Sequence, residues 1–348
     1  MTAARTLILY GSAHAGVDAA CAALFFGLFA SGHCGPGMFT ALAAAYNLLA
    51  FGFQPLVALA VDDRQFYRQA AAAGCALTAA AMLVPGSLAI PAVCVAGVGN
   101  ALFHVGGGSV ALRVKPGFAA PAGIFVAPGA AGLFLGSMLG RNGFSALWIV
   151  ALVLGLFSAL LLAHEAPALQ ARARLPRPLG RGRLIVLLLL SSIAMRSLVS
   201  AAFSSWTSSP ALIPLLVLAA ALGKGFGGVL ADGFGWMRTA LCAPLISIPL
   251  LMFSTASSME KILAMFLVAT TMPVALAAVA EAFPREPAFA FGLTAAALLA
   301  GSLPGLTPAQ SFLAIRSPMA AALVCALALY FGLRLARLSH AAQPQYAE

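Results

Sequence analysis

Three charged side chains stand alone inside long apolar stretches of the sequence: Asp18, Arg196 and Lys224. A charge at the middle of a lipid bilayer costs on the order of 2.5–3.5 kcal/mol, so a residue of this kind is expected to serve a function. A desolvated carboxylate can take up a proton near neutral pH, and buried cations can attract an anion. The three residues therefore suggest proton exchange and anion binding inside a membrane.

Asp18 shares one helical face with His14, four residues before it, and with Tyr10 one turn further away. We expect Asp18 and His14 to carry the coupling proton. The simpler alternative is a buried acid that only bonds to a neighbouring helix.

A second polar pair at the same spacing, Asn100 and His104, lies in a later apolar stretch and precedes three glycines. A histidine on an apolar helix is often only a packing residue, but here two separate stretches each carry a polar pair on one face. Lys224 lies eight residues before Asp232, as Gln54 lies eight residues before Asp62, and the alternative for the lysine is to extend toward the lipid headgroups. We predict substrate contacts from Arg196, Lys224, Asn100, His104, Gln54 and Tyr10.

The start of the second half of the chain resembles the start of the first. Aligning residues 5–9 with residues 183–187 gives an offset of 178, because 183 − 5 = 178, and this offset carries Asp18 onto Arg196. The alternative is an alignment that slips by one residue. With the offset of 178, the acid and the base would face each other across a central cavity and form a charge pair in one transport state.

The composition requires that most of these stretches lie in lipid. Hydrophobic residues make up 62% of the 348 positions and charged residues 8%, against roughly 45–50% and about 25% in soluble domains. In lipid the backbone must satisfy its own hydrogen bonds, and long runs rich in Ala and Leu do so as helices.

Twelve runs are long enough to cross a bilayer, so the predicted fold class is an all-α integral membrane protein. They fall into two six-helix bundles, residues 1–163 and 184–348, joined by a basic linker at 164–183. The predicted spans are 6–30, 38–61, 69–88, 90–112, 118–139, 144–163, 184–206, 210–231, 239–255, 261–281, 288–308 and 317–337.

The net charge of +10 is distributed along the chain as expected for a membrane protein rather than a nucleic-acid-binding one. With a cytoplasmic N-terminus, fourteen arginines and lysines fall on the cytoplasmic side and three on the other, namely Arg141, Lys261 and Arg316. We therefore expect a monomer in the plasma (inner) membrane, with both termini and the linker in the cytoplasm. Cleavage after Ala15 as a signal peptide is not expected, because it would leave the first span too short.

The six cysteines show no spacing typical of zinc or redox sites, so we expect no metal site and no cofactor. Five of them lie inside apolar spans and are expected to be buried. Cys34, in the loop after the first span, is expected to be exposed on the non-cytoplasmic side.

The segment GVLADGFGWMR, from Gly228 to Arg238, resembles the cytoplasmic loop motif of the major facilitator superfamily of transporters. The family pattern has a basic residue at the position of Gly233. A weaker copy at 58–68 keeps an acid and a terminal base. The resemblance implies two pseudosymmetric bundles and alternating access, with a cytoplasmic gate made by Gly228, Asp232, Arg238, Asp62 and Arg68.

The fifth predicted span resembles the glycine- and proline-rich motif of exporting members of the same family. The matching positions are Gly123, Pro128, Gly129, Gly132 and Gly136. The motif implies export by antiport. The alternative is that small residues here only let helices pack closely.

These observations predict a secondary transporter that exports a small anionic or amphipathic organic molecule in exchange for protons. The first alternative is a transporter of a transition-metal cation held by His14, Asp18 and His104, with Asn100 nearby. The second is a membrane enzyme or assembly factor on a transporter scaffold, for which the sequence offers no catalytic motif. We therefore expect no enzymatic activity, and we expect a small molecule, protons and lipid as partners.

Overall fold

The computed structural model describes residues 2–142, 147–164, 179–206, 212–252, 258–303 and 318–341. Within these ranges every regular element is helical, as predicted. Eight helices are long and apolar enough to cross a membrane, and three shorter apolar helices accompany them. The chain is a multi-pass all-α membrane protein.

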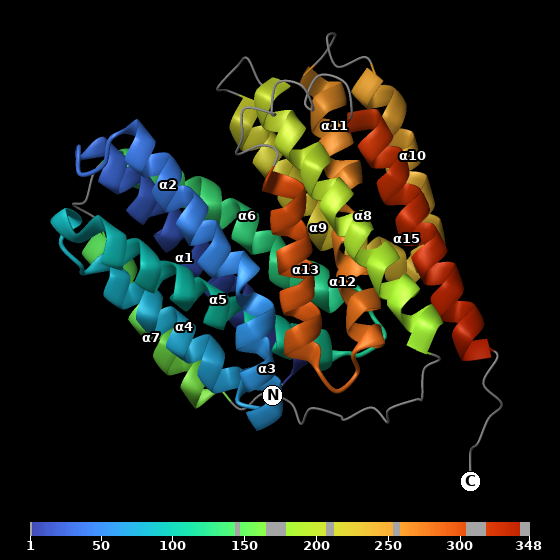
Figure 1. The fold of residues 1–348 in the computed structure, drawn as a ribbon, viewed down its shortest axis with the longest axis horizontal. Helices are drawn as coiled ribbons and strands as arrows, with labels where there is room; N and C mark the ends of the chain where they lie inside the picture. Colours follow the sequence, from blue (N-terminus) through green and yellow to red (C-terminus); the bar gives the residue numbers. More distant parts are fainter. Residues whose placement is uncertain are drawn as a thin grey trace.

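The helices of the N-terminal half are drawn from blue to green in Figure 1. The second span is interrupted by a π-helical turn, η1, and a short 3₁₀ turn, η2, precedes the fourth. The elements are α1 (Ala3–Ala30), α2 (Pro36–Asn47), η1 (Leu48–Gly52), α3 (Gln54–Arg64), α4 (Tyr67–Met82), η2 (Gly86–Leu88), α5 (Ala89–Val114), α6 (Ala120–Arg141) and α7 (Leu147–Ala163).

The C-terminal half repeats this plan. Its fourth span is split between two helices at Thr270, close to Pro273. The elements are α8 (Leu179–Trp206), α9 (Leu212–Phe234), α10 (Trp236–Met252), α11 (Ser258–Ala269), α12 (Thr271–Ala282), α13 (Pro287–Ser302) and α15 (Pro318–Ala341). The predicted spans match within a few residues at most ends. The clear exception is the third, predicted to reach residue 88, where α4 ends at Met82.

Small residues bring α1 and α6 into close contact. Gly132 and Gly136 of α6 pack against the backbone of Ala15 and Ala19 of α1, so that an added Cβ would strike the α1 carbonyls. Both pairs are spaced by four residues, one helical turn. This packing accounts for glycines that the sequence associates with an exporter motif.

The two halves meet through α6 with α9 and through α3 with α13, and the contacts repeat. Gly123 of α6 packs against the backbone of Lys224, and Gly292 of α13 packs against the backbone of Gln54. The glycines are 169 residues apart (292 − 123) and their partners 170 apart (224 − 54). Lys224 and Gln54 therefore occupy equivalent positions in the two halves, as the sequence predicts.

The equivalence of Asp18 and Arg196 is not supported. Gly132 packs against Ala15, and Gly301 packs against Ala194. Since 194 − 15 = 179, the offset between α1 and α8 is one residue larger than the alignment of the helix starts gives. Asp18 therefore corresponds to Ser197, whose hydroxyl donates to the Leu298 carbonyl at 2.8 Å.

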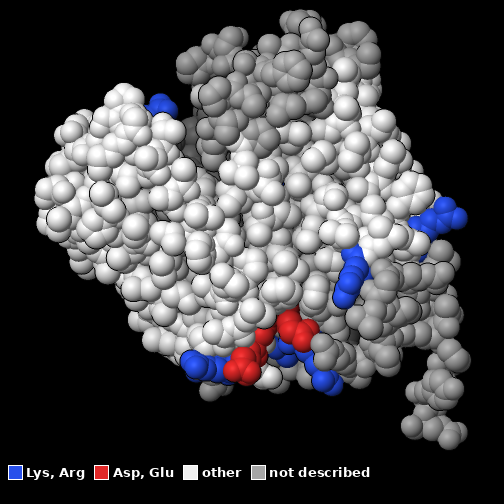
Figure 2. Space-filling view, in the orientation of Figure 1, with Lys and Arg blue, Asp and Glu red and all other residues white. Residues whose placement is uncertain are grey.

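The surface separates a charged end from an apolar belt. In Figure 2 the visible acidic side chains gather at the lower edge, below a broad surface with few charges. Large apolar side chains such as Leu152 and Trp148 are 65% and 56% exposed, which suits contact with lipid. Figure 1 places the start of α1, the start of α8 and the end of α15 at this same end.

The cysteines differ from expectation at three positions, one of which is Cys94, expected to be buried but only partly buried. Cys34 is only 4% exposed, so the prediction that it is accessible is wrong. The loop folds back, with the Cys34 amide donating to the Leu28 carbonyl at 3.3 Å. Cys242, expected to be buried, is exposed on α10.

Candidate functional site

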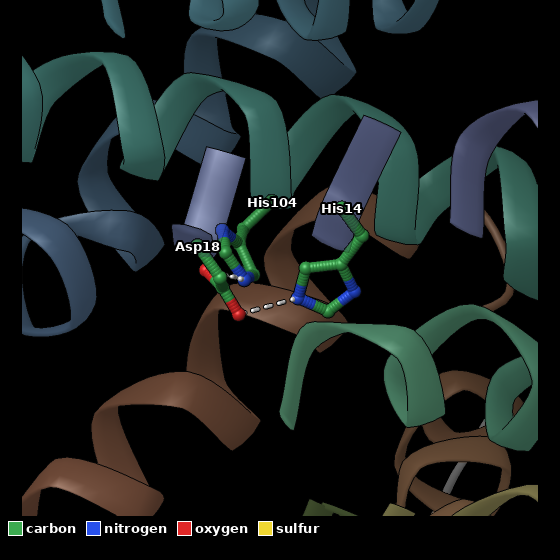
Figure 3. Close-up of side chains that lie close together, drawn as sticks. All are labelled: His14, Asp18 and His104. Carbon is green, nitrogen blue, oxygen red and sulfur yellow. Dashed lines mark ion pairs between the residues drawn. The ribbon is translucent and has the colours of Figure 1, made fainter. Parts of the chain in front are cut away.

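Two imidazoles and one carboxylate meet between α1 and α5. His14 Nε2 lies 3.2 Å from Asp18 Oδ2, and His104 Nε2 lies 3.8 Å from Asp18 Oδ1. Both rings point toward the carboxylate in Figure 3. The three residues are 4–6% exposed, so water does not screen their charges. The polar pairs of the first and fourth spans thus form one cluster, here called the His–Asp cluster (His14, Asp18 and His104).

Backbone carbonyls determine how both imidazoles are protonated. His14 Nδ1 lies 2.8 Å from the Phe125 carbonyl oxygen, and His104 Nδ1 lies 3.0 Å from that of Asn100. A carbonyl oxygen only accepts, so each Nδ1 carries a hydrogen. In the neutral imidazoles each Nε2 then presents a lone pair to the Asp18 carboxylate. Among the described residues, Asn100 Nδ2 also donates a hydrogen bond to this carboxylate, at 3.3 Å.

The cluster therefore has more acceptors than hydrogens. Two Nε2 lone pairs and a carboxylate repel one another unless at least one proton, or another cation, lies between them. An extra proton would be shared by Asp18 and an imidazole. Letting such a proton enter and leave is the chemistry this geometry supports best.

Helix α6 leaves space for the His–Asp cluster. Pro128 lies inside α6 and lacks the N–H that would bond to the carbonyl of Ile124, next to the carbonyl that His14 uses. Gly129 follows it, and a Cβ there would lie 2.5 Å from His14 Nε2 and 2.6 Å from Asp18 Oδ2. Two residues of the predicted packing motif thus make room for the cluster itself.

Aromatic rings enclose the two imidazoles. His14 stacks on Phe125 with ring centroids 4.7 Å apart, and Phe103 lies 6.0 Å from His14. Phe51 of η1 and Phe291 of α13 approach His104 at 6.1 and 6.3 Å. Because Phe291 belongs to the second half, the enclosure is built by both halves.

The glycine run in α5 makes this enclosure possible. A Cβ on Gly106 would strike the backbone of α4, one on Gly107 would meet Phe125, and one on Gly108 would strike the ring of Phe291. The three glycines therefore serve three different helix contacts.

Two other predicted substrate residues lie outside the cluster. Tyr10 is fully buried, with its ring edge-on to His164 at 6.2 Å and its hydroxyl without a partner among the described residues. His164 contacts Thr6 Oγ1 at 2.9 Å, and burial lowers its pKa. Gln54 is also fully buried and donates to the Ala50 carbonyl at 2.6 Å. Sequence reasoning placed His164 in the linker and so missed its link to α1.

The two predicted cations lie in the second half, near the middle of α8 and α9. Arg196 is 5% exposed, and its Nε and Nη2 atoms have no hydrogen-bond partner among the described residues. Lys224 lies within electrostatic range of Asp18, His104 and Arg196. No described salt bridge joins Asp18 to Arg196 in this state.

Asp232 bridges the two halves at the end of α9. Its two oxygens accept the backbone N–H groups of Ala119 and Ala120, at the start of α6, both at 2.8 Å. Trp236 Nε1 donates to the same carboxylate at 2.9 Å. An anion at the N-terminus of a helix is favoured by the helix dipole.

Asp62 repeats this contact in the other direction. Its oxygens accept the backbone N–H groups of Ala288 and Phe289, at the start of α13, at 3.0 and 2.8 Å. Here the two contacts made by Asp62 and Asp232 are called the carboxylate latches. Both are closed at once, so in this state the halves are joined at the end of the molecule that carries them.

The other predicted gate residues have different surroundings. A Cβ on Gly228 would strike Ala119 and Ala120, so the glycine allows the Asp232 latch to form. Arg238 is exposed and forms no described salt bridge with Asp232. Arg68 donates to the His164 carbonyl at 3.3 Å, inside the first half. The carboxylates rather than the arginines bridge the halves in this state.

One expectation falls mostly on a part of the chain that the structure does not describe. Most of the basic linker predicted at 164–183 lies within 165–178, outside the described residues.

No family model and no curated protein matches the sequence. Solved structures match over nearly the whole chain. A variant of the Escherichia coli fucose:proton symporter FucP, a major facilitator superfamily transporter, matches with a TM-score of 0.70 and 13% identity, covering 97% of this chain and 99% of its own. The human organic anion transporter MFSD10 matches with a TM-score of 0.71 and 15% identity, covering 96% and 99%. At this level of identity the matches establish the fold.

Proposed function

We propose that this chain, which has the fold of the major facilitator transporters, is a proton-coupled secondary transporter of a small anionic or amphipathic organic molecule. Asp18 and His14 carry the proton, and His104 and Asn100 complete the site. Arg196 and Lys224 attract the anionic group. The chain acts by alternating access in a plasma membrane, with both termini in the cytoplasm.

One observation carries this proposal: the His–Asp cluster has fewer hydrogen-bond donors than acceptors. Both imidazoles already use Nδ1–H to bind backbone carbonyls, and both Nε2 atoms face the same carboxylate. A purely structural cluster would be expected to satisfy its acceptors with fixed donors. A cluster that needs a mobile proton suits a carrier driven by a proton gradient.

Export by antiport remains a prediction from the glycine motif alone. Gly132 and Gly136 pack on α1, Gly123 packs on α9, and Gly129 makes room for the cluster. Packing therefore accounts for these glycines whatever the direction of transport.

The proposal is tested in vesicles that contain the purified protein and an internal pH indicator. A panel of organic anions is added outside, and we expect at least one to move protons across the membrane. Asp18→Asn should abolish this proton movement, whereas Asp63→Asn, which changes an exposed acid, should not. Anion movement without any proton movement in the unmodified protein would contradict the proposal.

A transition-metal cation is the second candidate for the transported species. One ligand atom from each of His14, Asp18 and His104 lies within 4.8 Å of the others, and metal-bound imidazoles usually donate their second N–H to a carbonyl, as here. The positive charges of Arg196 and Lys224 weigh against a cation. Zn²⁺ that stabilises the protein only when both histidines are present, and that crosses the vesicle membrane, would favour this candidate.

A further inference from the structure

The middle of the membrane region holds more positive than negative side chains. The chain has nine acidic residues, and Asp18 is the one in the middle of a described span. Of the other eight, Glu165 and Glu348 lie outside the described residues. The remaining six lie within three residues of a helix end: Asp62, Asp63, Asp232, Glu260, Glu281 and Glu286. Against this single mid-membrane acid stand Arg196 and Lys224.

Arg196 is a buried cation that forms no salt bridge among the described residues. Its guanidinium is almost completely buried, and its Nε and Nη2 atoms have no hydrogen-bond partner among the described residues. A buried charge left unpaired is costly, and arginine does not escape the cost by losing its proton. Asp18, the one acid in the middle of a described span, forms its described ion pairs with His14 and His104 and none with Arg196, so we infer that the anion for Arg196 comes from outside the protein.

Lys224 interacts electrostatically with both Asp18 and Arg196. Its backbone packs against Gly123 of α6, the helix whose Gly129 packs against His14 and Asp18. While Asp18 is ionised, it attracts Lys224 and repels any anion nearby. Once Asp18 is protonated, that competition ends and Lys224 is available to an anion.

We propose that a proton on the His–Asp cluster and an organic anion at Arg196 and Lys224 each strengthen the binding of the other, so that the two cross the membrane in the same direction. This inference rests on the proposed function and specifies its substrate class and coupling. It replaces the exchange expected from the glycine motif with co-transport. The positive sign of the coupling between proton binding and anion binding follows from Coulomb's law, since each added positive charge favours a nearby anion.

The coupling depends on the titratable and charged groups around the Asp18 carboxylate. His104 and Lys224 add positive charge when they are protonated, and the side-chain amide of Asn100 does not titrate. The groups facing or near the carboxylate are His14 and Cys21 from α1, Tyr46 from α2, Asn100 and His104 from α5, and Lys224 from α9. The backbone at Gly129 of α6 closes the remaining side.

The first test needs no ligand. If Arg196 lacks a counter-charge, Arg196→Gln should raise the melting temperature of the purified protein by several degrees, because it removes an unbalanced buried charge. Arg183→Gln, which changes an exposed arginine at the start of the same helix, should leave it unchanged. A large loss of stability in Arg196→Gln would mean that the arginine has a partner within the protein, and would overturn the proposal.

The second test uses sulfate and benzoate, which both stay ionised between pH 6 and pH 8, with neutral benzamide as the control. We expect at least one of the anions, and not benzamide, to stabilise the unmodified protein, and its apparent affinity to rise on acidification. For one linked proton the rise is at most about tenfold per pH unit. Sulfate also stabilises proteins in general. Only the stabilisation that is lost in Arg196→Gln is therefore taken as binding at this site.

Asp18→Asn identifies the linked group. It should bind the anion at pH 8 as tightly as the unmodified protein binds it at pH 6, with little dependence on pH. The proposal is overturned if no anion gives an Arg196-dependent effect, or if binding weakens on acidification.

Failure of this inference can be told apart from failure of the proposed function. Proton movement that depends on Asp18, with anion binding that does not depend on pH, would reject only the coupling. Absence of any Asp18-dependent proton movement in vesicles would reject the function as well.

Discussion

At the scale of single residues, the His–Asp cluster depends on a small defect in helix α6. Pro128 removes one helical hydrogen bond and Gly129 removes a side chain, so that His14 and Asp18 can lie directly against the helix. The cluster is therefore sensitive to a single carbon atom on α6.

We predict that Gly129→Ala disrupts proton coupling. Its Cβ would lie 2.5 Å from His14 Nε2 and must displace the imidazole or the carboxylate. Overpacking of this kind costs about 1–3 kcal/mol, so the protein should still fold while Asp18-dependent proton movement is largely lost.

The matched control is Gly155→Ala on α7, where an added Cβ meets nothing within 4 Å. Both variants are assayed in vesicles and by thermal denaturation. Normal proton movement in Gly129→Ala would show that the cluster tolerates displacement and is not the proton site.

The sequence predicted the residues of this cluster but not their full geometry. Two polar pairs at a spacing of four residues pointed to His14, Asp18 and His104 meeting. The carbonyl of Phe125, which orients His14, belongs to a residue with no polar side chain and left no signal. Arg196 was aligned one position away from its structural equivalent, because similar helix starts do not determine the register several turns later.

At the scale of helices, the carboxylate latches join polar groups of the two halves. Each places an ionised side chain on two backbone N–H groups at a helix start, where hydrogen bonds to charge are worth about 1.5–3 kcal/mol. The two latches occupy equivalent positions in the two halves. Both must therefore open before the halves can separate at this end of the molecule.

We predict that Asp232→Asn and Asp62→Asn each slow transport with little loss of substrate affinity. An amide keeps the shape but loses the charge, so the equilibrium shifts away from the state in which this end is closed. Initial rates and half-saturation concentrations are measured in vesicles for each variant and for the double variant.

Asp63→Asn is the control for this series, since Asp63 is exposed and adjacent to Asp62. The double variant should show the sum of the single effects, because the latches lie on different helices. A large fall in affinity with a normal maximal rate would place these acids in the substrate site instead.

The helices themselves were largely predictable. In lipid, an apolar run of about twenty residues satisfies its backbone as a helix. Within the described residues, ten of the twelve predicted spans differ from the structure only at their ends. The π-helical turn at Leu48–Gly52 and the break at Thr270 were not predicted, because such irregularities depend on packing against neighbouring helices rather than on composition.

At the scale of the whole molecule, the distribution of charge predicts which end faces the cytoplasm. The end with the latches also carries the start of α1, the start of α8 and the end of α15 (Figure 1). The fourteen-to-three excess of arginine and lysine in the sequence assigns this end to the cytoplasm.

We test this orientation with cysteines placed at two open glycines, Gly37 and Gly233, where a new side chain meets nothing within 4 Å. In a background without native cysteines, a reagent that cannot cross the membrane should label Gly37→Cys in intact cells. Gly233→Cys should be labelled only after permeabilisation. Labelling of Gly233→Cys in intact cells would reverse the proposed orientation.

The native Cys34, restored alone to the same background, provides a comparison. It lies in the same loop region as Gly37 but is buried, and burial raises the pKa of its thiol. Since the thiolate is the reactive form, we expect Cys34 to be labelled much more slowly than Gly37→Cys.

The reciprocity of the latches also bears on how such a chain can arise. Each half offers one carboxylate and one helix start, and each receives the same from the other, as in the isologous interface of a twofold dimer. Two copies of a single six-helix protein could therefore close the same contacts without any linker. The covalent linker is then not needed to form these contacts, and we expect separately expressed halves of this chain to bind each other.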